Sequence, residues 1–241
     1  MSAAIEIKDM SAGYGGKKVL EDISLTVMDG QKAALIGPNG CGKTTLMRAL
    51  IGLIPYSGSI KLHGKEVREM KRKEIASETA LLTQYFENAF DYTVWETVKL
   101  GGYVSAPADE EIAAILDKTG LSDLKDLPVS VLSGGQKQRV FLARTLAQKA
   151  PVLLLDEPMN HLDIKHICGI TELLKKDGGT VVGIYHDISL ARLLSDMIIF
   201  LKDGRIVHKG GSKDTDYRKL LAEVYDIDVY GYMNGISKLW T

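Results

Sequence analysis

The chain has 241 residues, 45% of them hydrophobic, which is enough to fill the core of one large domain or two small ones without disulfides. Its 30 basic and 31 acidic residues give a formal net charge of −1. This balance excludes a general electrostatic attraction to nucleic acid or to acidic membranes, so we expect no nucleic-acid partner.

Cysteine usage and the N-terminus indicate a cytoplasmic protein. The two cysteines, Cys41 and Cys168, are too few for a disulfide framework and lie too far from other ligand types for a metal site. Residues 1–6 lack a basic and then apolar signal, and no apolar run reaches the roughly 18 residues of a membrane span. Any action at a membrane is therefore expected to require docking onto other subunits.

The first elements predict an antiparallel edge followed by a strand, a loop and a helix. Residues 5–8 and 19–27 alternate between polar and apolar, as half-buried strands do. Residues 33–36 form an apolar strand that runs into glycines, and residues 43–51 have helical spacing.

The middle third is mostly helical. Short strands are expected at 59–62 and 79–83, and amphipathic spacing predicts helices at 94–100, 109–118 and 134–148.

The last third returns to buried strands. These strands are expected at 152–155, 180–184 and 197–201. Their β-branched and leucine-rich composition is typical of strands buried on both faces. Asp203 and Gly204 form a hairpin signal before a strand at 205–208, and residues 214–225 have the pattern of an amphipathic helix. The alternation of strands and helices predicts an α/β fold with a mostly parallel sheet.

The glycine-rich segment between the strand at 33–36 and the following helix predicts a phosphate-binding loop. It consists of Gly37, Pro38, Asn39, Gly40, Cys41, Gly42, Lys43 and Thr44, and Thr45 extends the set of ATP-contacting residues. In this pattern backbone N–H groups surround phosphate oxygens, Lys43 reaches the β- and γ-phosphates and Thr44 binds Mg²⁺. The alternative is a glycine-rich turn that merely connects two elements, which the match and its context disfavour.

Two carboxylates, Asp156 and Glu157, follow the buried strand at 152–155. Ligands of open α/β sheets bind at this end of the strands. We assign Asp156 to Mg²⁺ and Glu157 to general-base activation of the attacking water. A capped strand end with a simple turn would explain the segment alone, but its coexistence with a phosphate loop favours a catalytic pair.

A five-residue string before the helix at 134–148 carries a family resemblance. It consists of Leu132, Ser133, Gly134, Gly135 and Gln136. The flexible backbone of this helix start can bind a γ-phosphate. The alternative to anion binding is a helix start that Ser133 merely caps. The string resembles the signature of ABC transporter nucleotide-binding subunits, and the chain resembles these subunits from end to end.

The resemblance implies a fold and a division of the chain. The fold is a P-loop NTPase mixed-sheet core with an antiparallel β edge subdomain and an inserted helical subdomain, all within a single ABC ATPase domain of residues 1–241. The core and β subdomain take residues 1–84 and 151–212, and the helical subdomain with the signature takes residues 85–150. Residues 213–241 form a C-terminal helix and tail.

The resemblance also implies an ATP-sandwich homodimer, in which the signature of one copy completes the phosphate loop of the other. Tyr14 matches the aromatic residue that stacks on adenine, although a lone loop tyrosine is more often simple packing. Gln84 matches the glutamine that touches Mg²⁺ and the attacking water and senses the transmembrane partner. His186 matches the switch histidine, although alone it is a strand-end residue. Asp163 is expected to cross the dimer interface, and Met159 replaces the usual threonine without removing a catalytic group.

Further similarities concern the cargo. Residues 93–103, 160–164 and 220–229 resemble stretches of importers for iron-siderophores, haem and vitamin B12, or are ordinary features shared by many cassettes. Residues 85–103 lie where the family forms a groove for the permease. We therefore expect an ATPase on the inner face of the cell membrane, working with separate permease subunits and an extracytoplasmic substrate-binding protein.

Two alternatives stay open. One is a soluble, non-transport ABC ATPase of the iron–sulfur assembly, translation or repair type, although the chain has neither a second cassette nor a long coiled coil before the signature. The other is a regulatory subunit that binds nucleotide without hydrolysing it, against which Glu157 and His186 argue.

Overall fold

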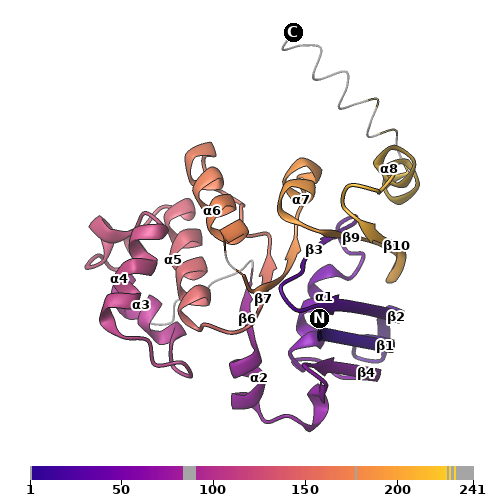
Figure 1. Ribbon diagram of the computed structural model, residues 1–241, viewed down its shortest axis with the longest axis horizontal. Coiled ribbons are helices and arrows are strands. Elements are labelled where there is room, and N and C mark those ends of the chain that lie inside the picture. Colours follow the sequence, from indigo (N-terminus) through magenta and orange to yellow (C-terminus); the bar gives the residue numbers. More distant parts are fainter. Residues whose placement is uncertain (1, 84–90, 177, 227, 229–230, 232–241) are drawn as a thin grey trace.

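The computed structural model describes residues 2–83, 91–176, 178–226, 228 and 231. These residues form two β-sheets and a set of helices (Figure 1). Within them, no helix is long and apolar enough to span a membrane. Gln84 and the following residues up to 90 fall outside the described part of the chain.

The first sheet is antiparallel and has the strand order β2-β1-β4-β5. Its strands are β1 Ala3–Tyr14, β2 Lys17–Met28, β4 Tyr56–Leu62 and β5 Lys65–Glu66. Ile5 pairs with Val27 on one side and with Leu62 on the other. The alternation expected from the sequence places these apolar side chains on the buried face of the sheet.

The second sheet has the strand order β10-β9-β3-β8-β7-β6. Its strands are β3 Lys32–Ile36, β6 Thr79–Leu82, β7 Val152–Asp156, β8 Thr180–Ile184, β9 Met197–Lys202 and β10 Arg205–Gly211. All neighbours are parallel except β9 and β10, which form a hairpin through Asp203 and Gly204, both with positive φ. The carboxyl ends of β3, β7 and β8 therefore meet at one edge.

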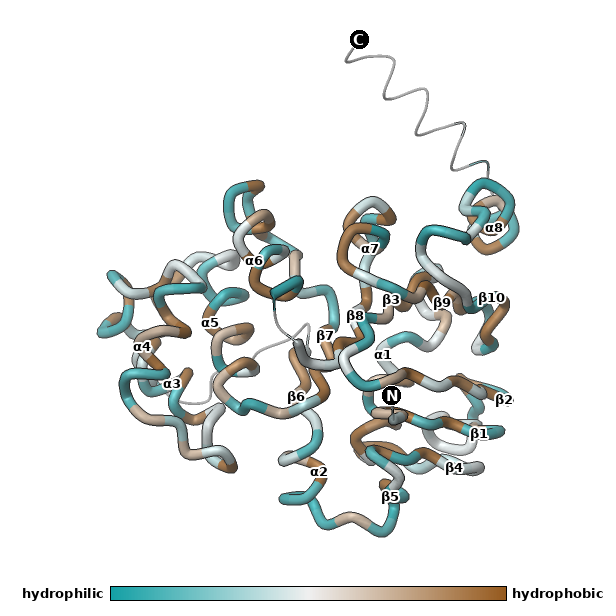
Figure 2. Tube along the Cα trace, in the orientation of Figure 1, coloured by the Kyte–Doolittle hydropathy of each residue, from teal (hydrophilic) through white to brown (hydrophobic). Residues whose placement is uncertain are grey.

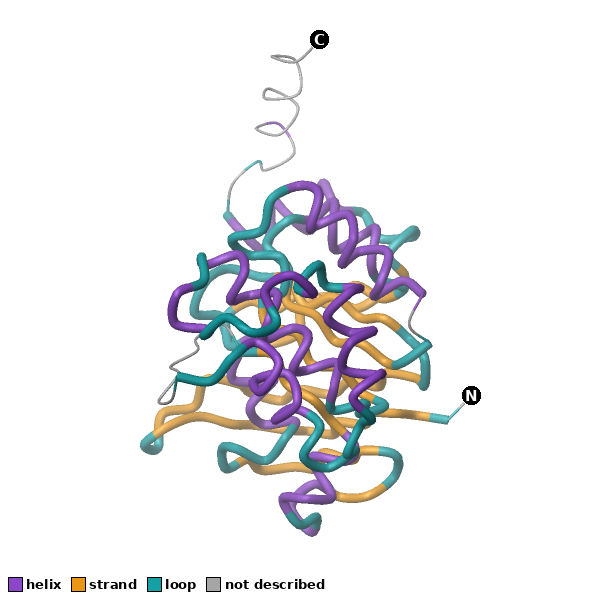
Figure 3. The backbone as a smooth tube through the Cα atoms, turned by 90° about the vertical axis from the view of Figure 1, so that its left-hand side faces the viewer, coloured by secondary structure: helices purple, strands orange, loops and turns teal. Residues whose placement is uncertain are grey.

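The helices surround the second sheet. They are α1 Lys43–Leu50, α2 Arg72–Glu78, α3 Val94–Gly101, α4 Asp109–Lys118, α5 Gly134–Ala147, α6 Ile164–Lys176, α7 Ile188–Leu194 and α8 Tyr217–Tyr225. Helices α3, α4 and α5 gather beside β6, away from the four-stranded sheet, and seen from their side they lie in front of the strands (Figures 1 and 3). The expected α/β fold, a mixed sheet with an antiparallel edge sheet, is confirmed.

The apolar core has two parts, one on each face of β3. Ala34 and Ile36 face a cluster with α3 to α8, whereas Ala33 and Leu35 face a cluster with α1 and the antiparallel sheet. Apolar residues accordingly concentrate along the inner strands, while the outer turns are polar (Figure 2). Because apolar clusters cover both faces of β3, the strand is held rigidly, and the loop that follows it starts from a fixed position.

Most expected elements are present, with differences at their ends, whereas the two-residue strand β5 and three helices were not expected. The C-terminal helix begins at Tyr217 and not at residue 214, because the Asp216 side chain accepts a hydrogen bond from the Lys219 amide and caps it. Helices α2, α6 and α7 were not expected. Two of these are only seven residues long, and their stability depends on tertiary packing.

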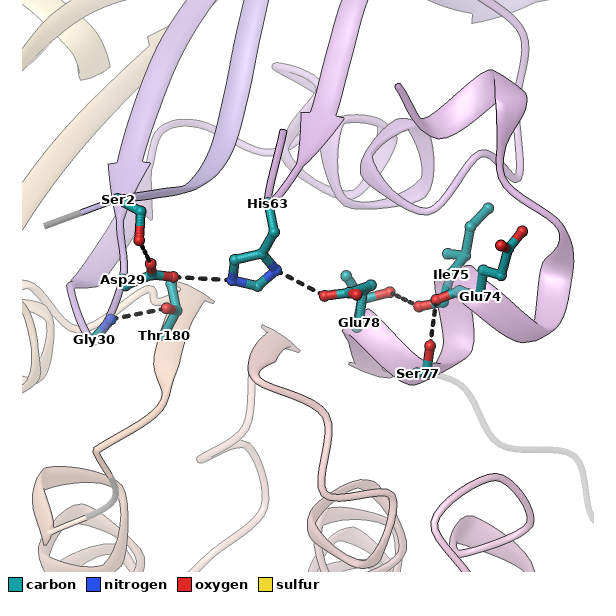
Figure 4. Close-up of polar contacts among 10 residues, drawn as sticks. Ser2, Asp29, Gly30, His63, Glu74, Ile75, Ser77, Glu78 and Thr180 are labelled. Carbon is teal, nitrogen blue, oxygen red and sulfur yellow. Dashed lines mark hydrogen bonds and ion pairs between the residues drawn. The ribbon is translucent and has the colours of Figure 1, made fainter. Parts of the chain in front are cut away.

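His63 connects the turn after β4 to two other elements (Figure 4). Its Nδ1 lies 2.7 Å from Glu78 Oε2 at the end of α2, and its Nε2 lies 2.9 Å from Asp29 Oδ1 between β2 and β3. A hydrogen bond from Ser2, and then the neighbouring His63, lower the pKa of Asp29. Each ring nitrogen of His63 thus lies within hydrogen-bond distance of a carboxylate oxygen, so the side chain links the ends of β2 and α2 to the turn after β4.

We predict that His63→Ala lowers the free energy of unfolding by about 1 kcal/mol, because two partly exposed polar contacts to carboxylates are lost. Urea unfolding at neutral pH measures the change. In a double-mutant cycle with Glu78→Gln, the two changes in the free energy of unfolding should be coupled. The control is Lys176→Ala, which removes an ion pair to Glu172 whose side chains are both at least 72% exposed. It should change the free energy of unfolding by less than about 0.5 kcal/mol. Additive effects of the His63 and Glu78 substitutions would contradict the bridge.

Candidate functional site

The loop between β3 and α1 is shaped to surround an anion. Gly40 and Gly42 have φ values of 79° and 108°, a region that favours glycine. Gly42 is the N-cap of α1, and no side chain caps this end. The first amides of α1 and its dipole therefore point toward the concave side of the loop.

Lys43 folds back over this loop. Its Nζ donates to the carbonyl oxygens of Gly37 and Pro38 at 2.7 and 2.9 Å, and the residue is only 7% exposed. A buried ammonium held by carbonyls adds positive charge where the helix dipole already favours an anion. The loop as a whole is suited to phosphate oxygens.

Close backbone contacts require glycine at two positions. A Cβ at Gly37 would collide with the Leu201 carbonyl oxygen and lie 2.8 Å from Cys41 Sγ. A Cβ at Gly135, the second residue of α5, would lie 2.6 Å from the His161 carbonyl oxygen. The phosphate loop is thus packed tightly on β9, and the start of α5 is packed on the loop after β7.

Thr44 and Asp156 bring two oxygen ligands together. Thr44 Oγ1 donates to Asp156 Oδ2 at 2.9 Å, and Asp156 is 2% exposed at the end of β7. Burial raises the pKa of Asp156, while the Thr44 hydrogen bond acts in the opposite direction. Hydroxyl and carboxylate oxygens fit Mg²⁺ together with phosphate oxygens. Within the described residues no group of three or more His, Cys, Asp and Glu could hold a metal alone.

The Glu157 carboxylate is held at both of its oxygens. His186 Nε2 lies 2.5 Å from Oε1, and Asn160 Nδ2 donates to Oε2. Glu157 has a φ of 54°, a conformation that L-residues rarely adopt, and Gln138 of α5 donates to its carbonyl oxygen at 3.2 Å. A strained backbone fixed from several sides orients this carboxylate.

A cavity of about 640 Å³ joins the phosphate loop to this carboxylate. Its lining residues are Asn39, Gly40, Gly42, Lys43, Thr44, Thr45, Glu157, Asn160 and His186. The volume falls in the usual range for small-molecule sites. The structure therefore brings together most of the residues expected from the phosphate loop and from the two strand ends, and it adds Asn160, which the sequence reading did not single out.

The expected signature residues do not reach this cavity. Ser133 is exposed and caps α5: its Oγ accepts from the Gln136 amide at 3.3 Å, and its own amide donates to Gln136 Oε1 at 2.8 Å. Gly134 and Gly135 follow in the first turn of α5. The structure therefore shows the helix cap that was the alternative for Ser133, and anion binding at this helix start stays a prediction.

Two further expected residues also lie apart from the cavity. Asp163 accepts from the His166 amide at 3.0 Å, which lowers the pKa of Asp163, and it also lies 2.8 Å from the His166 ring. Tyr14 is 43% exposed, and its hydroxyl accepts from Arg48 at 3.3 Å.

The fold and the cavity define a P-loop nucleotide-binding protein, and the comparison with known sequences gives its family. The sequence profile of the ABC transporter family matches residues 20–160, so the chain belongs to this family, as its resemblance led us to expect.

The particular relatives are ATP-binding proteins. The chain is 38% identical over 236 residues to the petrobactin import ATP-binding protein YclP of Bacillus subtilis, covering 93% of this chain and 94% of that protein. It is 35% identical over 238 residues to the ferric enterobactin transport ATP-binding protein FepC of Escherichia coli, covering 93% and 88%. It also matches the uncharacterized ABC transporter ATP-binding protein YvrA of Bacillus subtilis at 35% identity, covering 93% of this chain but only 54% of that protein.

Solved structures of ABC transporter cassettes have the same fold as this chain. An ATP-binding subunit of an ABC transporter superposes with a TM-score of 0.82 at 25% identity, covering 92% of this chain and 98% of that chain. A dimeric bacterial ABC transporter cassette superposes with a TM-score of 0.80 at 28% identity, covering 88% and 100%.

The raised pKa of Asp156 predicts that its charge destabilises the nucleotide-free protein. The folded state holds this proton more tightly than the unfolded state, so stability falls as pH rises above the ordinary pKa of 3.8. Asp156→Asn should therefore raise the free energy of unfolding at pH 7 by on the order of 1 kcal/mol. Chemical denaturation without nucleotide measures this, with exposed Asp123→Asn as the control. A less stable Asp156→Asn protein would be inconsistent with this assignment.

Proposed function

We propose that this chain is the ATP-binding and ATP-hydrolysing subunit of an ABC importer and that it energises uptake through a separate permease. The observation that carries the proposal is the single cavity in which a phosphate loop with Lys43 faces the Glu157 carboxylate. The import and transport ATP-binding proteins among its relatives support the same function.

ATP occupies this cavity with its phosphates in the loop 37–44. The amides at the start of α1 and the Lys43 ammonium bind the β- and γ-phosphate oxygens, and Tyr14 stacks on the adenine. Thr44 and Asp156 would hold Mg²⁺, which would neutralise charge on the phosphates. Gln84, assigned to the same metal and to the attacking water, lies outside the described residues.

Hydrolysis depends on Glu157. Its carboxylate accepts a proton from the attacking water, and His186 and Asn160 keep its two oxygens directed into the cavity. His186 also contacts the γ-phosphate. Because Gln138 on α5 holds the Glu157 carbonyl, the base is linked to the helix that carries the signature.

A second copy of the chain completes each site. Ser133, Gly134, Gly135 and Gln136 lie at the start of α5, where Ser133 and Gly134 are exposed, and meet the γ-phosphate held by the partner copy, while Asp163 crosses the interface. The dimeric cassette among the structural relatives supports this arrangement.

The remaining assignments concern the transport system. The cargo is an iron-siderophore, haem or cobalamin, delivered by an extracytoplasmic binding protein, and the chain works on the inner face of the cell membrane. The proposed division assigns residues 85–150 to the helical subdomain with the groove for the permease and residues 1–84 and 151–212 to the core with its β subdomain. It assigns residues 213–241 to the C-terminal helix and tail; residues 84–90 and 232–241 of this division lie outside the described part of the chain.

The proposal predicts that Glu157→Gln lowers ATP turnover at least about 100-fold while MgATP binding is kept, because only proton transfer is lost. Phosphate release and binding of a fluorescent ATP analogue measure the two steps. Lys43→Ala is the matched control, since it should lose nucleotide binding as well. Wild-type-like turnover in Glu157→Gln would remove this residue as the base.

A further inference from the structure

The residue before His186 is a buried tyrosine. Tyr185 directly follows β8, is 5% exposed and belongs to the apolar cluster on the face of the sheet that α3 to α8 cover. The alternation of side chains along the strand places Val181, Gly183 and Tyr185 on this same face. Although Tyr185 lies past the last residue of β8, its ring is therefore part of the core.

The Tyr185 ring occupies the space over the Gly183 backbone. A Cβ at Gly183 would collide with Tyr185 Cε2 and would lie 2.5 Å from both Cζ and the hydroxyl oxygen. Gly183 pairs with Ala34 of β3 on one side and with Leu155 of β7 on the other, so its backbone is fixed within the sheet. A glycine inside a strand is typical of such a close approach. The missing side chain is what lets the ring fold back onto the strand.

The chain on the other side of His186 is fixed as well. Asp187 is the N-cap of α7, and its side chain accepts hydrogen bonds from the amides of Ser189 and Leu190 at 2.7 and 3.2 Å. The chain thus passes from β8 to α7 with His186 between a buried ring and a helix cap (Figure 2). The imidazole itself is 44% exposed, so its direction depends on how its two neighbours hold the backbone.

This backbone directs the imidazole to the Glu157 carboxylate. The Glu157 amide donates to the Ile184 carbonyl oxygen at 3.2 Å, which aligns the ends of β7 and β8. Two residues after Ile184, His186 Nε2 lies 2.5 Å from Glu157 Oε1. Tyr185 is the residue between these two contacts, so the position of its ring sets how the imidazole approaches the carboxylate.

We propose that Tyr185 is a positioning residue that acts through His186: its ring, seated on the bare backbone of Gly183, holds the imidazole against the Glu157 carboxylate. Gly183 and Tyr185 act as one steric unit, because the ring occupies the space that a side chain at residue 183 would need. The role of Glu157 in ATP hydrolysis rests on the proposed function, whereas the contact between His186 and Glu157 does not.

The first measurement needs no nucleotide. In the full chain with ¹⁵N-labelled histidine, Gly183→Ala should displace the ring-nitrogen resonances of His186 toward their positions in Glu157→Ala, because both changes remove the contact. The resonances of His208 on β10 should not move. The matched control is Gly169→Ala on α6, where a Cβ would meet no neighbouring group within 4 Å, and it should leave His186 unchanged.

The second measurement is ATP turnover. Gly183→Ala should lower kcat about fivefold, the effect of losing about one net hydrogen bond to the base. The KM for MgATP should stay within about twofold, because the phosphate loop is left intact. Tyr185→Phe, which keeps the ring and removes only the hydroxyl group, should leave both kcat and KM within about twofold of the parent protein.

A rescue variant separates the steric unit from two independent packing defects. Tyr185→Leu removes the ring and should displace the His186 resonances and lower kcat as Gly183→Ala does. Combining Gly183→Ala with Tyr185→Leu refills the space over the strand and should bring kcat back to within about twofold of the parent protein.

Additive losses of kcat in this double variant would overturn the proposal. So would His186 resonances in Gly183→Ala equal to those in Gly169→Ala, or a loss of kcat in Tyr185→Phe, which would assign the effect to the hydroxyl group. A parent protein that does not hydrolyse ATP would contradict the proposed function instead, and the resonances would still decide the role of Tyr185.

Discussion

The hydrogen bond from Thr44 to Asp156 joins the two parts of the site. Thr44 belongs to the helix after β3, and Asp156 ends β7, two strands away in the sheet. Parallel pairing through β8 brings these strand ends to one edge, so the phosphate loop and the carboxylates share one cavity. Without this register the loop would be an anion site with no catalytic group opposite it.

Two residues of the site have energetically unfavourable conformations or surroundings. Asp156 carries a buried carboxylate with a raised pKa, and Glu157 has a left-handed backbone. Rigid neighbours offset both: Thr44 binds the first carboxylate, while His186, Asn160 and Gln138 fix the second residue. Such strain persists only when the surrounding structure over-determines it, as at many functional sites.

The sequence predicted much of this because its patterns are local. Apolar runs predicted β3, β7, β8 and β9, and the glycine and lysine pattern predicted the loop between β3 and α1. The contact between Asn160 and the Glu157 carboxylate was not expected, since it depends on the turn after β7, in which Glu157 and His161 have positive φ. Tertiary contacts of this kind leave no periodic signal. Short helices such as α2 and α7 were missed for the same reason.

The central claim is that each cavity is half of an ATP site. Ser133 and Gly134 are exposed and do not line the cavity that Lys43 lines. In the proposed function a second copy of the chain brings them to the phosphates. The direct measurement is the molar mass of Glu157→Gln in MgATP by light scattering, with and without the added change Ser133→Arg. The account predicts a dimer for Glu157→Gln that is lost when Ser133 is also replaced. A Glu157→Gln protein that binds MgATP yet stays monomeric, or a dimer that tolerates Ser133→Arg, would contradict it.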